Sequence, residues 1–119
     1  MKFVPGFGNS HPELMILGDA PGYYEEQAER PFVGPSGEIV RGMLSKAGIS
    51  PEQCFFDNVV PYRPPGNAIK RIKELGISVE QFYPKLLQTI NTIKPNCILA
   101  LGNTALKALT CKNGIQNYR

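Results

Sequence analysis

The sequence predicts a single α/β domain built on a short parallel sheet. Three apolar runs, at residues 14–17, 54–60 and 97–101, carry this prediction. Each run is short, rich in branched or aromatic side chains and bounded by Gly, Pro, Asn or Asp, which is typical of strands buried on both faces of a parallel sheet. Helical patterns separate the runs. Strand, loop and helix alternating in this way indicate right-handed crossover connections.

The first helix is expected over residues 36–47, between the first two strands. Ser36 is expected to cap its N-terminus, and Gly48 stands where a glycine is preferred after a helix. Five apolar residues fall on one face of this helix, as expected for a helix packed on a sheet. They are Ile39, Val40, Met43, Leu44 and Ala47.

Two further helices are expected, over residues 78–93 and 104–110. The longer one places its apolar side chains on one side, and Ser78 and Gln81 have the spacing of a capping box. Asn103 is expected to cap the shorter helix.

The composition is that of an ordinary globular domain. The chain has 119 residues, of which 42% are hydrophobic, enough for one core, and a net charge of +3 permits a polyanionic partner without requiring one. The single His argues against a zinc site. No run approaches the ~20 apolar residues of a membrane span, and the first residues lack a secretory signal. The cysteines form no CxxC pair and are expected to be free and buried thiols in a cytoplasmic protein; they are Cys54, Cys97 and Cys111.

Three loops are expected to form one composite site. Ligands of open parallel sheets bind beyond the carboxyl ends of the strands. This rule places residues 17–37, 58–67 and 101–103 on one rim. Within the first loop, residues 23–26 are expected to form a mobile tip. His11 is expected to lie at the surface.

Asp19 is the candidate catalytic group of the first loop. It lies between Gly18 and the stretch Ala20-Pro21-Gly22. The two glycines let a ligand approach the backbone, and the proline stiffens the turn. A carboxylate held there can orient a water or face a developing cation. The alternative is an aspartate that only caps a helix or closes a turn.

Phe32 is the candidate stacking group. It lies between two proline-stiffened segments, where its ring can stack on a planar ligand or can pin the loop to the core. Ser36 and Gly37 then begin a helix, whose free backbone N–H groups can bind a phosphate.

Asn58 ends the second strand and can present one donor and one acceptor to a nucleobase edge, or can close the turn that follows. The next loop, residues 62–67, is stiff and cationic and contains Asn67. It opens the only basic cluster of the chain, which is either a solvated face or a groove for a nucleic-acid backbone. The cluster contains Arg63, Lys70, Arg71 and Lys73.

Five motifs in order resemble those of the family-4 uracil-DNA glycosylases and of the glycosylase-like domain of certain phage DNA polymerases. The resemblance runs from about residue 13 to residue 118. The motifs are GDAPG at 18–22, RPFVGPSG at 30–37, NVV at 58–60, RPPGN at 63–67 and LG at 101–102.

The resemblance implies a three-layer α/β/α sandwich and a DNA-repair enzyme. Such an enzyme flips uracil out of single- or double-stranded DNA and hydrolyses its N-glycosidic bond. Asp19 would position the water and face the sugar cation, Phe32 would stack on uracil and Asn58 would read its edge. The resemblance further implies that the backbone of Gly18, Ala20, Pro21 and Gly22 binds uracil, and that Ser36, Gly37, Arg63, Asn67 and Lys70 contact DNA.

Two departures from the family concern its chemistry. The family has Glu where this chain has Asp19, which retracts the carboxylate by ~1.5 Å, and a displacement of that size can cost ~100-fold in rate. The family also binds a 4Fe–4S cluster through four cysteines. Two of those positions correspond to Tyr62 and Phe82 here, and no CxxC pair precedes the first strand. We therefore expect no metal and no other cofactor, with the two rings filling the space.

A third departure concerns extent. The closing motif of the family, a His near a fourth strand, would lie beyond Arg119, so residues 1–119 are expected to form one domain that corresponds to the N-terminal two thirds of the family fold. The leading hypothesis is a cluster-free glycosylase that acts on uracil-containing DNA. The alternative is an inactive DNA-binding module of a phage-type polymerase. Either would work in the cytoplasm of a bacterial or phage-infected cell, away from membranes.

Overall fold

A four-stranded sheet forms the centre of the molecule in a computed structural model, which describes residues 1–110. The strand order is β1-β3-β2-β4. Strand β2 (Leu14–Gly18) pairs in parallel with both β3 (Cys54–Asn58) and β4 (Cys97–Ala100). These are the three strands predicted from the apolar runs, and the predicted parallel sheet is confirmed.

Strand β1 (Phe7–Gly8) was not predicted. It pairs antiparallel with Phe55 and Phe56 at the outer edge of β3. Because it has only two residues and both are exposed, it carries no apolar pattern that a sequence could reveal.

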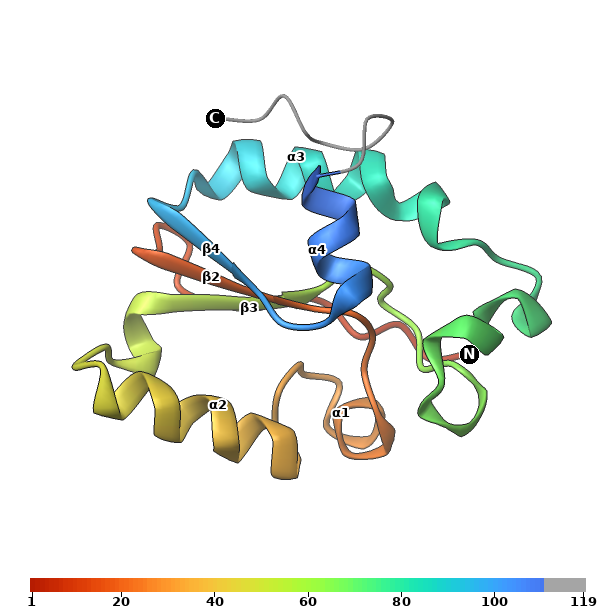
Figure 1. Ribbon diagram of the computed structural model, residues 1–119, viewed down its shortest axis with the longest axis horizontal. Coiled ribbons are helices and arrows are strands. Elements are labelled where there is room, and N and C mark those ends of the chain that lie inside the picture. Colours follow the sequence, from red (N-terminus) through yellow and green to blue (C-terminus); the bar gives the residue numbers. More distant parts are fainter. Residues whose placement is uncertain (111–119) are drawn as a thin grey trace.

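Helices cover both faces of the sheet, which confirms the three-layer α/β/α arrangement (Figure 1). Helices α1 (Tyr23–Ala28) and α2 (Pro35–Lys46) lie on one face, and α3 (Tyr83–Ile93) and α4 (Asn103–Thr110) lie on the other. Four 3-10 segments complete the fold: η1 (Pro51–Gln53), η2 (Pro65–Asn67), η3 (Ile69–Leu75) and η4 (Val79–Phe82). No helix in this part of the chain is long and apolar enough to cross a membrane.

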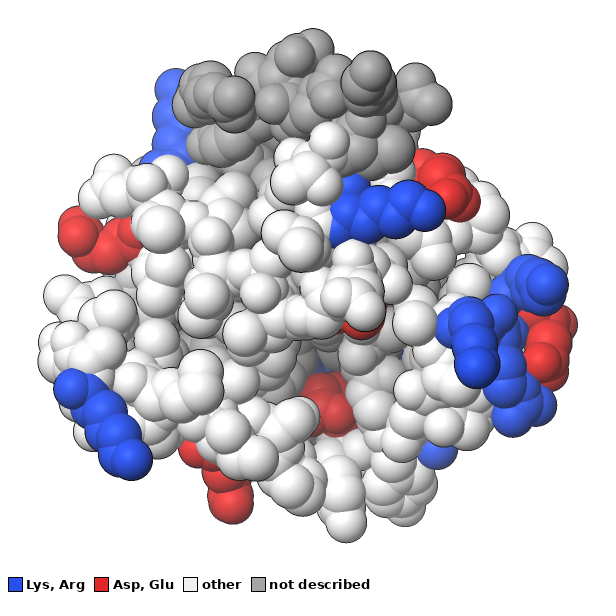
Figure 2. Space-filling model, viewed as in Figure 1, with Lys and Arg blue, Asp and Glu red and all other residues white. Residues whose placement is uncertain are grey.

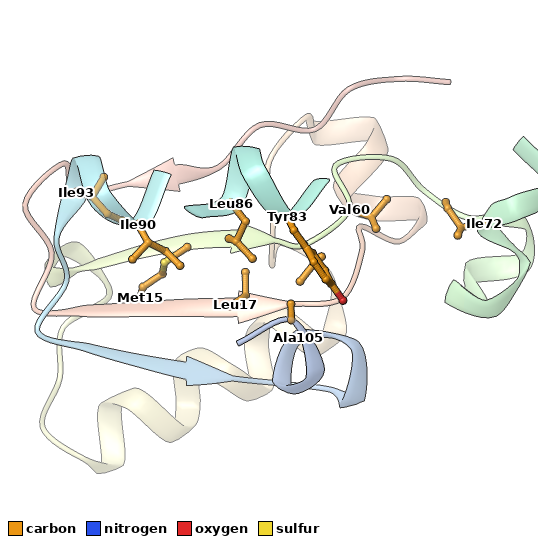
Figure 3. Packing of buried hydrophobic residues seen from close by; sticks show 11 residues of the cluster. Met15, Leu17, Val60, Ile72, Tyr83, Leu86, Ile90, Ile93 and Ala105 are labelled. Atoms are coloured by element: carbon orange, nitrogen blue, oxygen red, sulfur yellow. The ribbon is translucent and has the colours of Figure 1, made fainter. Parts of the chain in front are cut away.

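Two cores result, one on each face of the sheet. Met15 and Leu17 of β2 point toward α3 and α4, where they pack with Leu86, Ile90 and Ala105 (Figure 3). The intervening residue of β2 points the other way, because side chains alternate along a strand. Ile16 therefore joins the second core, with Phe32, Val40, Leu44, Cys54 and Phe56.

The strands differ in burial more than expected. Strand β2 is central and almost wholly buried, whereas β4 forms an edge and leaves Cys97 and Leu99 exposed. The prediction of strands buried on both faces is therefore wrong for β4. Cys54 is buried as expected, while Cys111 lies outside the described residues.

The helix ends show several corrections. Gly34 is the N-cap of α2 and Pro35 its first residue, so Ser36 lies inside the first turn and does not cap it. Proline suits this first position because its missing N–H would have no partner there. The predicted helix over residues 78–93 begins as the 3-10 segment η4. Its capping signal is confirmed, since the Gln81 side chain accepts the Ser78 N–H at 2.7 Å.

Candidate functional site

The carboxyl ends of β2 and β3 bring the predicted site residues together. Gly18 lies opposite Asn58 in the parallel register, and the pairing continues as the Val60 N–H donates to the Asp19 carbonyl at 3.0 Å. A cavity of about 340 Å³ opens beside these strand ends. Its walls include Ala20, Pro21, Gly22, Phe32 and Asn58 from the predicted base-binding set, and Ser36 and Asn67 from the predicted DNA-binding set.

Gly18 lets the two candidate base-binding groups approach each other. A Cβ at this position would lie 2.6 Å from Asn58 Oδ1 and 2.7 Å from Phe32 Cζ, both far below van der Waals contact. The Phe32 ring and the Asn58 amide therefore meet across a bare strand end. Any larger residue at Gly18 would push one of them out of place.

The Phe32 backbone is held in an uncommon conformation. Its φ is 56°, in the left-handed region that a bulky side chain rarely adopts. Its carbonyl accepts a hydrogen bond from the Arg41 guanidinium and lies against Gly37, where a Cβ would overlap it. Its ring centroid is 5.9 Å from that of Phe56. Phe32 therefore both packs on the core and lines the cavity, and backbone strain of this kind collects at functional sites.

Asn58 is buried, with 7% of its surface exposed, and it borders the cavity. At this place the Asn58 amide can offer one donor and one acceptor to a ligand in the cavity.

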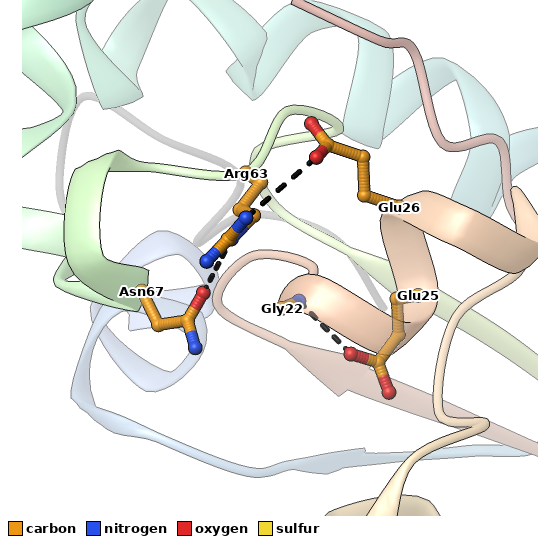
Figure 4. Close-up of polar contacts among 5 residues, drawn as sticks. All are labelled: Gly22, Glu25, Glu26, Arg63 and Asn67. Atoms are coloured by element: carbon orange, nitrogen blue, oxygen red, sulfur yellow. Dashed lines mark hydrogen bonds and ion pairs between the residues drawn. The ribbon is translucent and has the colours of Figure 1, made fainter.

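Glu25 organises the two halves of the first loop, and the sequence did not reveal it. Its carboxylate accepts three backbone N–H groups: that of Gly22 at 3.0 Å, that of Val33 at 3.1 Å and that of Gly34 at 2.9 Å. The side chain is only 7% exposed and turns back toward Gly22 from helix α1 (Figure 4). The expected mobile tip at residues 23–26 is therefore wrong: this segment is a helix whose buried acid ties the loop together. The spacing Gly22-x-x-Glu25 is that of a capping box, but without the Ser or Thr that would mark it.

Asp19 lies at the N-terminus of α4 and not among the residues that line the cavity. Its Oδ1 accepts the Ala105 N–H at 2.8 Å. The cap of α4 is thus supplied by the residue that follows β2, and Asn103, which was expected to cap this helix, is its first residue. Gly102, with φ 114°, makes room for the carboxylate, because a Cβ there would lie 2.6 Å from Oδ1.

Arg63 connects the second loop to helix α1. Its Nε donates to Asn67 Oδ1 at 2.7 Å, and its Nη1 lies 3.8 Å from Glu26 Oε1 (Figure 4). Its guanidinium also lies 5.4 Å from the ring centroid of Tyr23. These contacts hold the arginine beside the cavity mouth.

The rest of the basic cluster lies farther from the cavity. Lys and Arg side chains gather at one edge of the molecule, over η3, which carries Lys70, Arg71 and Lys73 (Figure 2). Arg71 is neutralised by a two-bond pair with Glu74, at 2.8 and 3.1 Å. Lys70 is exposed on η3 and does not line the cavity.

Comparison with known proteins decides the family. A model of the uracil DNA glycosylase superfamily matches residues 5–117. The chain belongs to the uracil DNA glycosylase superfamily.

Several members of the superfamily are similar to this chain along most of its length. The Type-4 uracil-DNA glycosylase of Pyrobaculum aerophilum is 42% identical over 89% of the chain, and that of Archaeoglobus fulgidus is 36% identical over 87%. The matches cover 52% and 50% of those two proteins, so the chain spans about half the length of these relatives. A DNA polymerase of Bacillus phage SP01 is 27% identical over 99% of the chain. This match covers 12% of the length of the polymerase.

Aromatic rings pack together at the two positions where the family resemblance would place cluster cysteines. The ring centroids of Tyr62 and Phe82 are 6.0 Å apart, and Phe3 adds an edge-to-face contact with Tyr62 at 5.9 Å. The predicted packing of Tyr62 and Phe82 is confirmed. Iron–sulfur clusters need thiolate ligands, which neither residue supplies, and residues 1–110 contain no group of three or more Cys, His, Asp or Glu that could hold a metal. The described residues therefore do not fit a cluster.

Proposed function

We propose that this chain is the base-binding part of a uracil-DNA glycosylase, which receives a flipped-out uracil in the cavity between Phe32 and Asn58. One observation carries the proposal: the Phe32 ring and the Asn58 amide meet across Gly18 at a cavity of about 340 Å³. A flipped base is bound by stacking and by hydrogen bonds to its Watson–Crick edge. Phe32 can supply the first and Asn58 the second.

The proposed reaction breaks the bond between the sugar C1′ and uracil N1. The bonding electrons leave with uracil, so negative charge develops on the base and positive charge on the sugar; water then adds to C1′ and loses a proton. Preorganised donors stabilise such charge. Gly22 donates its N–H to Glu25 and Pro21 has none, which leaves the N–H groups of Asp19 and Ala20 to face the uracil anion.

Asp19 is the proposed carboxylate on the sugar side. Its Oδ1 is held by the Ala105 N–H, so Oδ2 is the oxygen available to orient the attacking water. Asp19→Asn keeps an oxygen for that N–H and removes only the charge, whereas Asp19→Ala removes both. We expect each variant to lower the rate of uracil release by about 100-fold. Only Asp19→Ala should also lose about 1 kcal/mol of stability, because it leaves α4 uncapped.

The assay uses single- and double-stranded oligonucleotides with one uracil, followed by alkali, and urea unfolding monitors stability. Full activity in Asp19→Asn would show that the carboxylate only caps α4. A wild-type protein that binds the oligonucleotides but never cleaves them would overturn the proposed activity. The result would then favour the alternative, an inactive DNA-binding module of a phage-type polymerase; the chain is similar to part of a phage DNA polymerase.

Tyr23 and Tyr24 make single-stranded DNA the preferred substrate within this proposal. Both rings line the cavity mouth and are 50% and 57% exposed, with their centroids 5.4 Å apart and nearly perpendicular. Exposed rings beside a cationic group stack on successive bases of a single strand, at about 1–3 kcal/mol per base. We expect Tyr24→Ala to weaken binding of a single-stranded oligonucleotide about tenfold, and Tyr24→Phe to leave it within about twofold.

Binding can be followed by the quenching of tyrosine fluorescence, because the chain has five Tyr and no Trp. Equal affinities for Tyr24→Ala and the wild type would exclude stacking on Tyr24. Duplex DNA provides the comparison. Its bases are already stacked on one another, so the affinity for duplex DNA should change less when Tyr24 is replaced.

A further inference from the structure

Asp57 is a half-buried carboxylate beside the proposed base-reading residue. It precedes Asn58 on β3, and its Oδ1 accepts the Asn58 backbone N–H at 2.8 Å. The two side chains point to opposite faces of the sheet, because they are neighbours on a strand. Asn58 borders the base cavity, and both residues border a second cavity of about 190 Å³ between β3, helix α3 and the N-terminal segment.

The Asn58 N–H needs this partner because the sheet does not supply one. The next residue, Val59, donates its N–H to Gly18 on the β2 side, and backbone N–H groups alternate in direction along a strand. The Asn58 N–H therefore faces the other edge of β3. There β1 pairs only with Phe55 and Phe56 and ends before it reaches Asn58. The Asp57 carboxylate takes the place of the missing strand.

The surroundings of Asp57 make a charged side chain costly. The second cavity is walled mainly by apolar groups, including Phe3, Phe55 and Phe82. Among its lining residues Lys85 of α3 is the only other charged side chain, and no charged group faces Asp57 from β3 or from the N-terminal segment. Burial raises the pKa of Asp57 to about 6, and the Asn58 N–H and Lys85 offset this only in part. Proteins tend to keep such unfavourable groups where function uses them.

We propose that Asp57 is a positioning residue for Asn58: its carboxylate fixes the end of β3, so that the Asn58 amide faces the base in the cavity. This proposal rests on the proposed uracil pocket. A carboxylate accepts a stronger hydrogen bond than the neutral acid. Protonation therefore loosens the Asn58 backbone, and base excision should decline as the pH falls through the titration of Asp57.

Two substitutions separate the charge from the hydrogen bond. Asp57→Asn retains a neutral acceptor and cannot titrate, so its kcat/KM should lie about tenfold below the wild type at pH 8 and stay flat between pH 5 and 7. Asp57→Leu removes the acceptor and should lower kcat/KM further at every pH. The wild type should show an acid-side decline with a midpoint near pH 6. Glu74→Gln, which removes an exposed carboxylate on η3, is the control and should keep the wild-type profile.

An NMR titration tests the hydrogen bond without any need for activity. The backbone amide signal of Asn58 should shift with a midpoint near pH 6 in the wild type and should not titrate in Asp57→Asn. An Asn58 signal that ignores pH in the wild type, or an acid-side decline that persists in Asp57→Asn, overturns the positioning role. A wild type that releases no uracil at any pH instead contradicts the proposed function, and the NMR result still decides whether Asp57 holds Asn58.

Discussion

Glu25→Ala is expected to lower the free energy of unfolding by about 3–5 kcal/mol and to abolish base binding. The substitution leaves the N–H groups of Gly22, Val33 and Gly34 without their acceptor. Hydrogen bonds to a charged group contribute about 1.5–3 kcal/mol each, and a buried N–H without a partner costs a comparable amount. The same bonds join both halves of the loop that carries Phe32, so the stacking ring should lose its position together with the stability.

Urea unfolding and uracil binding would measure the two effects of Glu25→Ala. Glu26→Ala is a matched control on the same helix, because Glu26 forms only a 3.8 Å ion pair with Arg63 near the surface. Such pairs contribute about 0–1 kcal/mol. The stability of Glu25→Gln should lie between those of the wild type and Glu25→Ala. Its amide oxygen can still accept a backbone N–H, but its amide nitrogen would face another N–H and could not accept it. If Glu25→Ala were no less stable than Glu26→Ala, the carboxylate would not be what holds the loop.

The parts of the fold that a sequence can predict are those set by local pattern. Strand β2 is buried on both faces, so its residues form one apolar run that can be recognised without knowing its neighbours. The parallel order then places Gly18 opposite Asn58, and the predicted convergence of the loops follows from it. Strand β1 leaves no such pattern. It exists because the edge of β3 accepts two residues whose side chains remain exposed.

The roles of the two key acids depend on distant backbone groups. Asp19 was open to two interpretations, a catalytic carboxylate or a cap, and the cap is formed with an N–H that lies 86 residues away. Glu25 binds two N–H groups from residues 33 and 34, beyond the reach of any spacing rule for helix starts. In both cases the sequence shows a carboxylate near a glycine. Only the fold shows which orphan N–H groups it must satisfy.

Asp57→Asn is expected to raise stability at neutral pH, by up to about 3 kcal/mol, and to leave it unchanged in acid. The pKa of Asp57 rises from 3.8 in the unfolded chain to about 6 in the fold, so folding is opposed wherever the group is ionised in both states. The cost is absent below about pH 4, develops as the pH rises toward 6 and is complete above it. A difference of about two pKa units corresponds to about 3 kcal/mol.

Urea unfolding at pH 4 and pH 8 checks this expectation for Asp57→Asn. Glu74→Gln provides a control of opposite sign, because Arg71 lowers the pKa of Glu74 and an acid with a lowered pKa stabilises the fold above its titration range. Its removal should not stabilise the protein at any pH. If Asp57→Asn proved less stable than the wild type at pH 8, the ionised carboxylate would stabilise the fold, which contradicts the expectation. A variant that is more stable but slower in uracil release would instead show that the fold tolerates a half-buried charge because it positions Asn58.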